Sequence, residues 1–313
     1  MPMKHLIYPS VLFCFIYLSF VSSPGVAQQE PVIPPDRSLR IIGFGAHPDD
    51  AEYKMGGVAA RWAARGDKVK LVSMTNGDLG HYVQSGGPLA RRRAQEVAEA
   101  GKILGVESAV MDIHDGELMP TLENRKLMAN LIREWQADIV LSHRTNDYNP
   151  DHRYVGVLAH DTAFMVSIPF FMPLIEETEN NPIYLHYSDR FKKPYPFQPD
   201  IIVDIDDVFE KKIEAIEKLV SQVFEVNYSS VGRERERAIQ SVPKDPKERR
   251  AWLVKHHGAR YAAVADEYRD QLIKWYGPER GKAVKYAEAF EICQYGRQPT
   301  EEELKQLIPF LSE

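Results

Sequence analysis

The sequence predicts an α/β protein with a Rossmann-like, largely parallel sheet and helices on both of its faces. Five short runs rich in β-branched residues have the composition of buried strands, at residues 39–46, 68–75, 107–113, 137–143 and 199–205. Helical patterns separate the first four of these runs. Strands and helices in alternation require right-handed crossovers, which place parallel strands side by side.

Residues typical of helix ends indicate where the helices between the first four strands begin and end. The patterns over residues 51–64 and 89–104 each stop just before a glycine, which readily takes the left-handed conformation that ends a helix. Thr121 is a suitable N-cap for a third helix over residues 121–136. We therefore expect three crossover helices.

After the fifth strand the sequence is mainly helical. Residues 206–225 continue the α/β unit, and residues 259–277 form an amphipathic helix that Gly277 ends. Its apolar stripe is more typical of core packing than of a cofactor site, and consists of Tyr261, Tyr268, Leu272 and Trp275. We expect residues 231–313 to be a helical extension that packs on the main domain, residues 39–230, or serves a homo-oligomer.

The first 27 residues resemble an export signal. Lys4 supplies a positive start, residues 6–20 are apolar but too short to span a bilayer, and Ala27 ends a small-residue cleavage site. Residues 28–38 then form an extended leader. We expect a periplasmic or extracellular protein without a stable membrane span. Cleavage would leave Cys293 as the one cysteine, which excludes a disulfide framework.

The charge pattern does not indicate nucleic acid as a partner. The chain carries a formal net charge of -6, and its basic clusters are short and mixed with acidic residues. Two enzyme classes also fit poorly. The "GFGAHP" turn lacks the third glycine of a dinucleotide-binding loop, and no Gly-x-Ser-x-Gly elbow is present.

Polar residues follow the ends of four predicted strands. They are His47, Asp49 and Asp50 after the first, residues 75–78 after the second, Asp115 after the third, and residues 143–153 after the fourth. The carboxyl ends of parallel strands meet along one edge of the sheet, where ligands bind. We therefore expect the functional site at this edge.

The residue types at this edge suit a hydrolytic metal site. His47 and Asp50 can reach one ion from a single turn, and His152 on a neighbouring loop can supply the third ligand. An open position for water completes such a site, and Asp49 would be free to accept a proton. The simpler alternative is that one aspartate only caps the following helix.

Several motifs resemble the PIG-L/LmbE-like family of zinc-dependent N-deacetylases. They are "AHPDDAE" (46–52), "TNGDLG" (75–80), "ARRRAQEVAEAGKILGV" (90–106), "HDGEL" (114–118), "PDHR" (150–153) and "AEAF" (287–290). The resemblance implies His47, Asp50 and His152 as zinc ligands and Asp49 as general base. It also implies an N-acetylated amino sugar or glycoconjugate as substrate. Ferrous iron or cobalt would suit the same ligands.

Further residues are assigned around this predicted site. The resemblance implies that Arg93 reaches the substrate, and we assign Asp78 and His81 to substrate binding because they follow the second strand. Asp151 precedes a ligand and could orient a neighbouring group. Tyr82 and Tyr148 could stack on a sugar ring. We assign structural or surface roles to the histidines outside this set: His114, His160, His256 and His257.

One position departs from the family pattern. Asn149 stands where many members carry a histidine, three residues before the third ligand. Its amide can donate a hydrogen bond to an oxyanion but cannot hold a titrating proton. Either Asp49 performs both proton transfers, or another histidine fills the space, with His143, His81 and His186 as the candidates. A third alternative is a non-catalytic or weakly active carbohydrate-binding protein that retains the site.

Overall fold

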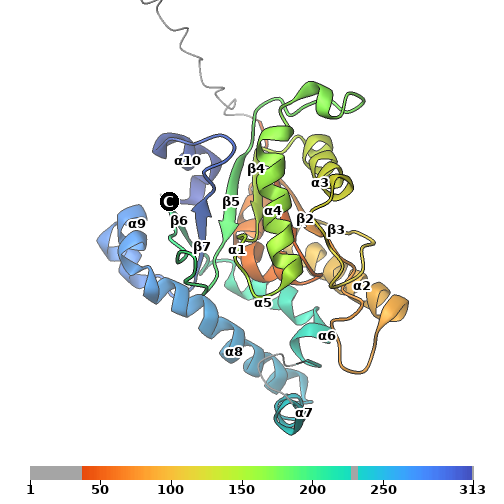
Figure 1. Cartoon of the computed structure of the whole chain (residues 1–313). Helices are drawn as coiled ribbons and strands as arrows, with labels where there is room; N and C mark the ends of the chain where they lie inside the picture. Colours follow the sequence, from red (N-terminus) through yellow and green to blue (C-terminus); the bar gives the residue numbers. More distant parts are fainter. Residues whose placement is uncertain (1–36, 227–231, 312–313) are drawn as a thin grey trace, which may run out of the picture. The chain divides into compact units, whose positions relative to one another are not determined.

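The computed structural model describes residues 37–226 and 232–311, which lie in the compact unit Pro34–Glu313. They form a 7-stranded sheet in the order β3-β2-β1-β4-β5-β7-β6 (Figure 1). The strands are β1 (Arg40–Gly45), β2 (Lys68–Ser73), β3 (Glu107–Val110), β4 (Ile139–Ser142), β5 (Ile183–Tyr187), β6 (Ile201–Asp204) and β7 (Ala287–Ile292). The pairs among β1 to β5 are parallel, whereas β7 is antiparallel to both of its neighbours. The predicted α/β class with a largely parallel sheet is confirmed.

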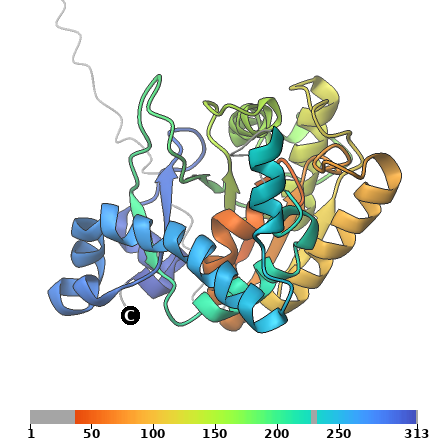
Figure 2. The ribbon, with the colours of Figure 1, turned by 90° about the horizontal axis from the view of Figure 1, so that it is seen from below.

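Helices cover both faces of the sheet. Those described are α1 (Asp50–Ala64), α2 (Gly86–Leu104), α3 (Leu122–Trp135), α4 (Pro150–Met165), α5 (Phe209–Glu217), α6 (Val220–Val223), α7 (Gly232–Gln240), α8 (Pro246–Glu267), α9 (Arg269–Ala283) and α10 (Glu301–Leu307). Two short 3₁₀ turns are Pro169–Phe171 and Pro309–Leu311. Helices α3 and α4 pack together on one face, and α1, α2, α5 and α8 pack on the other (Figure 2).

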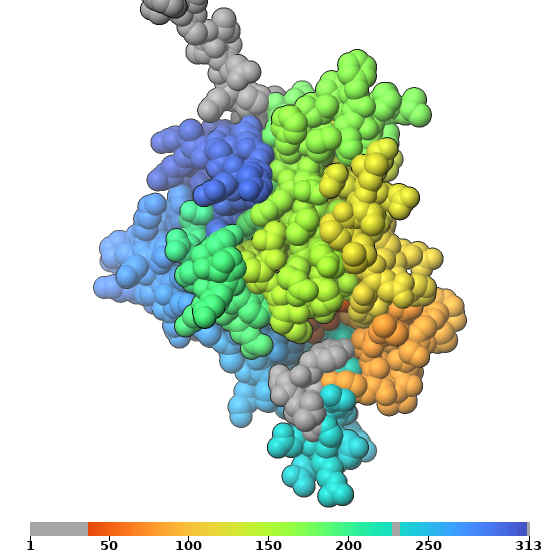
Figure 3. All heavy atoms as spheres, viewed as in Figure 1, coloured from red at the N-terminus to blue at the C-terminus, as the bar shows by residue number. Residues whose placement is uncertain are grey.

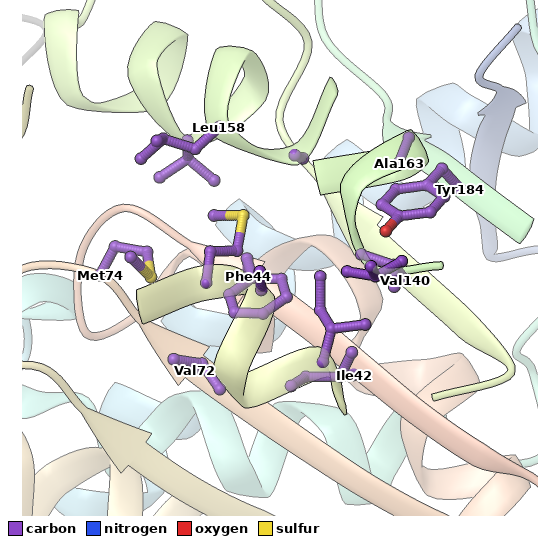
Figure 4. Packing of buried hydrophobic residues seen from close by; sticks show 14 of the residues in the cluster. Ile42, Phe44, Val72, Met74, Val140, Leu158, Ala163 and Tyr184 are labelled. Atoms are coloured by element: carbon purple, nitrogen blue, oxygen red, sulfur yellow. The ribbon is translucent and has the colours of Figure 1, made fainter. Parts of the chain in front are cut away.

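The core beneath α4 explains how the sheet face is buried. Ile42 and Phe44 of β1, Val72 of β2 and Val140 of β4 are fully buried there against Leu158 of α4 (Figure 4). Alternate residues of a strand point to opposite faces, so Ile42 and Phe44 share this face. Burial of such side chains contributes roughly 1.5–3 kcal/mol each.

Two strands and one helix boundary differ from expectation. Strands β5 and β7 lie outside the five predicted runs. The β7 sequence "AEAFEI" has little β-branched character, and it becomes a strand because its neighbours β5 and β6 bury it. Residues 231–313 are therefore not only helical, since they supply a strand inside the sheet. The helix expected over residues 259–277 breaks at Tyr268, where α8 ends and α9 begins.

The other predicted helix ends agree with the structure. The Thr121 side chain accepts the Asn124 N–H, as an N-cap does. Gly105 takes a left-handed conformation after α2, and Gly277 interrupts α9 with a φ of 80°.

The predicted export signal and most of the leader lie outside the described residues. Within residues 37–226 and 232–311, no helix combines the length and the apolar character needed to cross a bilayer.

Candidate active site

The turn between β1 and α1 places three predicted site residues at the carboxyl edge of the sheet. The Asp50 Oδ2 atom accepts the N–H groups of Ala46 at 3.0 Å and His47 at 2.8 Å, which fixes the turn. Gly45 permits this approach, because a Cβ there would lie 2.8 Å from the Asp50 Cβ. The glycine of "GFGAHP" thus serves a tight carboxylate turn.

The structure brings His47, Asp50 and His152 together. His152 Nε2 lies 3.2 Å from His47 Nδ1 and 3.4 Å from Asp50 Oδ2, and His47 Nδ1 lies 3.4 Å from the same oxygen. One ligand atom from each residue therefore falls within a 4.8 Å group. His152 enters from the start of α4, 105 residues after His47. Two imidazoles and a carboxylate now face a common point.

The far side of each imidazole is held by a carboxylate. His47 Nε2 lies 3.2 Å from Asp115 Oδ1 and 3.4 Å from Asp151 Oδ2. His152 Nδ1 lies 3.1 Å from Asp147 Oδ2. Metal-binding histidines commonly have such partners, which fix the ring orientation and raise the basicity of the opposite nitrogen. Asp151 also accepts the Gly116 N–H at 2.7 Å.

The donor set and its charge fit a divalent cation. Three carboxylates, Asp50, Asp115 and Asp151, lie within 3.4 Å of the His47 ring nitrogens. Burial alone raises the pKa of Asp50, but His152 and His143 hold it well below its ordinary value. The carboxylate is therefore anionic, and a cation would balance the excess negative charge. Two nitrogen donors and one oxygen donor suit zinc, ferrous iron or cobalt.

Asp49 lies beside this group but belongs to a different contact. Its Oδ1 atom is 3.4 Å from the Arg93 guanidinium, and it makes no side-chain cap for α1. Burial raises the Asp49 pKa, while Arg93 opposes the shift. Arg93 is 1% exposed and also donates to the carbonyl oxygens of Gly77 and Pro48. Arg93 thus contacts Asp49 from an enclosed position, and its predicted contact with substrate stays a prediction.

His143 is the one of the three candidate substitute histidines that lies at the site. Its ring stacks on His152 at a centroid distance of 4.1 Å, and Nε2 is 3.3 Å from Asp50 Oδ2. Burial, together with the nearby His152, lowers the His143 pKa to about 4. The ring is therefore neutral at pH 7. The His81 ring instead pairs with Glu225, and the His186 ring contacts His160 and the His143 backbone oxygen.

Two predicted substrate residues are engaged in other contacts. Asp78 is buried and accepts from His114 Nδ1 at 2.6 Å and from the Asp115 N–H at 3.1 Å. It thus supports the loop that carries Asp115. His81 Nε2 pairs with Glu225 at 3.1 Å, and its Nδ1 accepts two backbone N–H groups. Both side chains are thus held by protein contacts, and their predicted part in substrate binding stays a prediction.

Of the two aromatic residues predicted to stack on a sugar, one is exposed beside the site and the other is covered by an arginine. Tyr148 is 69% exposed and lies edge-on to His152 at 6.1 Å, so its ring is available beside the metal-ligand group. The Tyr82 ring is covered by the Arg235 guanidinium at 3.9 Å.

Asn149 caps α4. Its side-chain oxygen accepts the Asp151 N–H at 2.8 Å, and Pro150 occupies the first turn. The amide nitrogen is consequently the atom that could donate to a ligand. Asp147 accepts the Asn149 backbone N–H at 2.9 Å, which joins the cap to the carboxylate that holds His152.

Sequence reasoning assigned no role to three acidic residues of the site. Asp115 bridges His47 and Arg93, with its Oδ2 atom 3.9 Å from the guanidinium. Asp147 holds His152, and Glu52 is 2% exposed, with its pKa raised by burial to about 8. The position of Asp115 after a strand was a usable signal. The roles of Asp147 and Glu52 depend on contacts that the sequence does not display.

Fold and site together define an α/β protein with a metal-type His/His/Asp group at the carboxyl edge of its sheet. Residues 42–163 match the family model described as PIG-L, GlcNAc-PI de-N-acetylase. The diacetylchitobiose deacetylase of Thermococcus kodakarensis is 30% identical over 189 residues, which cover 58% of this chain and 70% of that relative. The chain belongs to the PIG-L/LmbE-like deacetylase family.

Two further relatives show the range of this resemblance. The structure of the N,N'-diacetylchitobiose deacetylase of Pyrococcus horikoshii has a TM-score of 0.61 and 25% identity, over 81% of this chain and 83% of that one. The 4-oxalmesaconate hydratase of Pseudomonas putida is 25% identical over 207 residues, 64% of this chain and 79% of that relative.

Proposed function

We propose that the protein is an exported, metal-dependent amidohydrolase that removes an acetyl group from an N-acetylated amino sugar or glycoconjugate. The observation that carries this proposal is the convergence of His47, Asp50 and His152 beside Asp49, whose side chain contacts Arg93 instead. The deacetylase relatives support the acetamide as the reacting group. A zinc ion held by the three ligands supplies a Lewis acid, which polarises an amide carbonyl and acidifies water.

Asp49 is the proposed general base. Its raised pKa, caused by burial, makes it a better proton acceptor than an ordinary carboxylate, while Arg93 opposes this shift and orients the group. Asp49 takes a proton from water as the water oxygen bonds to the acetamide carbon. The carbon–nitrogen bond then breaks, acetate leaves, and the same proton passes from Asp49 to the departing amine. One residue can therefore perform both transfers.

Other residues would position the reactants. Asp115, Asp151 and Asp147 hold the two imidazoles in place, so the ligand set is rigid before substrate arrives. Tyr148 offers an exposed ring beside His152 on which a sugar can stack. Asn149 offers an amide N–H to the oxyanion.

The proposal is tested by metal content and acetate release. Purified protein should contain zinc or another divalent metal and release acetate from diacetylchitobiose or N-acetylglucosamine. Asp49→Asn should retain the metal but lower kcat by about 10²-fold to 10⁴-fold, because it removes the base. Asp207→Asn, at an exposed carboxylate paired with Arg61, is the matched control and should keep full activity.

Other outcomes would favour different functions. Bound metal without acetate release across a panel of sugars would favour the carbohydrate-binding alternative. The hydratase relative supports a second candidate, in which the same site adds water to an unsaturated carboxylate. Turnover of 4-oxalmesaconate without deacetylation would select that reaction.

Export is a separate part of the proposal. It rests on the charged start, the apolar stretch and the small-residue site within residues 1–27. Cell fractionation with N-terminal sequencing should find a chain that begins at Gln28 outside the cytoplasm. A full-length chain in the cytoplasmic fraction would contradict it.

A further inference from the structure

A second group of metal-type side chains lies on the sheet face covered by α4. It consists of His160 of α4, His186 of β5 and Cys293, which follows β7, and one ligand atom of each falls within 4.8 Å of the others. Glu291 is the register partner of His186, and Cys293 is two residues further on. The His186 and Cys293 side chains therefore share a sheet face. No residue of this group belongs to the proposed catalytic site.

The hydrogen bonds of His186 decide which nitrogen carries its proton. Nδ1 lies 3.2 Å from the backbone oxygen of His143, and a carbonyl can only accept. The proton is therefore on Nδ1, and Nε2 presents a bare lone pair. His160 Nε2 faces that lone pair at 3.0 Å.

Cys293 is arranged in a comparable way. Its Sγ atom accepts the Tyr295 N–H at 3.4 Å, a contact that fixes the position of the sulfur. His186 is 5% exposed and Cys293 3% exposed, so both ligand atoms are removed from bulk water. A backbone carbonyl thus holds the outer nitrogen of His186, the pattern that orients metal-binding histidines, and a backbone N–H contacts the Cys293 sulfur itself.

A pocket of about 400 Å³ borders the His160 side of the group. Its lining includes His160 itself together with Thr145, Val157, Asp161, Phe164 and Tyr295. The His160 and Tyr295 rings meet edge to face at 5.0 Å, which joins α4 to the C-terminal segment, the blue region beside α4 in Figure 3. Of the three members, His160 therefore lines the pocket, while His186 and Cys293 are buried.

We propose that His160, His186 and Cys293 bind a second, structural transition-metal ion of the zinc class. Two imidazoles and a thiolate select zinc or a similar borderline ion over magnesium or calcium, which prefer oxygen ligands. The ion joins three segments that are distant in sequence: α4, β5 and the chain after β7. It therefore attaches the C-terminal segment to the centre of the fold. The surface or structural role predicted for His160 becomes that of a ligand.

Cobalt binding distinguishes the two sites, because the His160/His186/Cys293 group contains a sulfur ligand and the His47/Asp50/His152 group does not. Metal-free protein titrated with Co²⁺ should bind about two ions per chain and develop a sulfur-to-cobalt charge-transfer band in the near ultraviolet. Cys293→Ser should lose that band and bind about one ion. His47→Ala should also bind about one ion but keep the band. His256→Ala, at an exposed histidine of α8, is the matched control and should behave as the wild type.

Two further measurements, zinc content and the Tm of thermal unfolding, test the proposal if one of these variants folds poorly. Protein purified from zinc-supplemented medium should contain about two zinc ions, and His160→Ala about one. Zinc should raise the Tm of metal-free His47→Ala but not that of a His47→Ala/Cys293→Ser double variant. Folded wild type that binds one ion and shows no charge-transfer band would overturn the proposal, and the group would then be a His–His hydrogen bond.

Discussion

Asn149 shows how one residue can serve both a helix and a reaction. Its oxygen caps α4, while its amide hydrogens remain suitable for an oxyanion. Many family members carry a histidine at this position, and the neighbouring His143 cannot supply a proton at neutral pH because its pKa is about 4. In the proposed mechanism both proton transfers are therefore assigned to Asp49, whose environment is set by burial and by Arg93.

Two substitutions separate the roles of Asn149. Asn149→Ala should lower the free energy of unfolding by about 0.5–2 kcal/mol through loss of the cap. It should also lower kcat by roughly 10²-fold through loss of an oxyanion donor. Asn149→Ser keeps a capping oxygen and should restore stability but not kcat. Urea unfolding and acetate release measure the two effects. Full activity in Asn149→Ser would leave only the structural role.

At the scale of the element, α8 is attached to α1 through a buried histidine. The His257 ring stacks on Tyr53 with a centroid distance of 5.4 Å, and among the described residues its Nδ1 atom has no hydrogen-bond partner. Burial, with help from Arg260, lowers the His257 pKa to about 3. The contact therefore requires a neutral ring, and protonation opposes the packing of α8.

This contact predicts a pH dependence of stability. Below its ordinary pKa of 6.5, the unfolded chain binds a proton at His257, whereas the folded chain binds one only near pH 3. The stabilisation is complete above pH 6.5 and is lost as the pH falls from there toward 3. Between about pH 7.5 and about pH 5.5, the wild type should lose about 1 kcal/mol more than His257→Phe in urea unfolding. Equal losses in the two proteins would contradict this account.

At the scale of the whole molecule, a buried ion pair joins the C-terminal strand to the start of the fold. Glu288 of β7 accepts the Gly57 and Val58 N–H groups of α1, each at 2.8 Å, and pairs with Lys212 of α5. Lys212 is fully buried and also donates to the Tyr53 carbonyl at 2.8 Å. Residues more than 200 positions apart thus depend on one another.

Removal of one partner should be costly. Lys212→Met leaves Glu288 buried without its cation, and we expect the free energy of unfolding to fall by about 3–5 kcal/mol. The Lys212→Met/Glu288→Gln double variant should be less destabilised than the sum of the two single variants, because it buries no unpaired charge. Urea unfolding of all four proteins measures the coupling. Strict additivity would show that the pair contributes no interaction of its own.

The sequence by itself determined the local structure and the edge where the site lies. Local features depend only on residues that are close in sequence, so they can be predicted before the fold is known. They include the periodicity of strands and helices, the glycines that end helices, and the Thr121 cap. Polar residues after successive parallel strands must meet at one edge, which is why His47, Asp50 and His152 could be grouped.

Only the tertiary structure decided which groups contact one another. In the folded chain Arg93 is paired with Asp49, and His81 is paired with Glu225. The segment "AEAFEI" forms strand β7 of the sheet. The tertiary structure also brought Cys293 to His160 and His186. These outcomes depend on sheet order and on contacts between distant segments, and neither leaves a periodic signal in the chain.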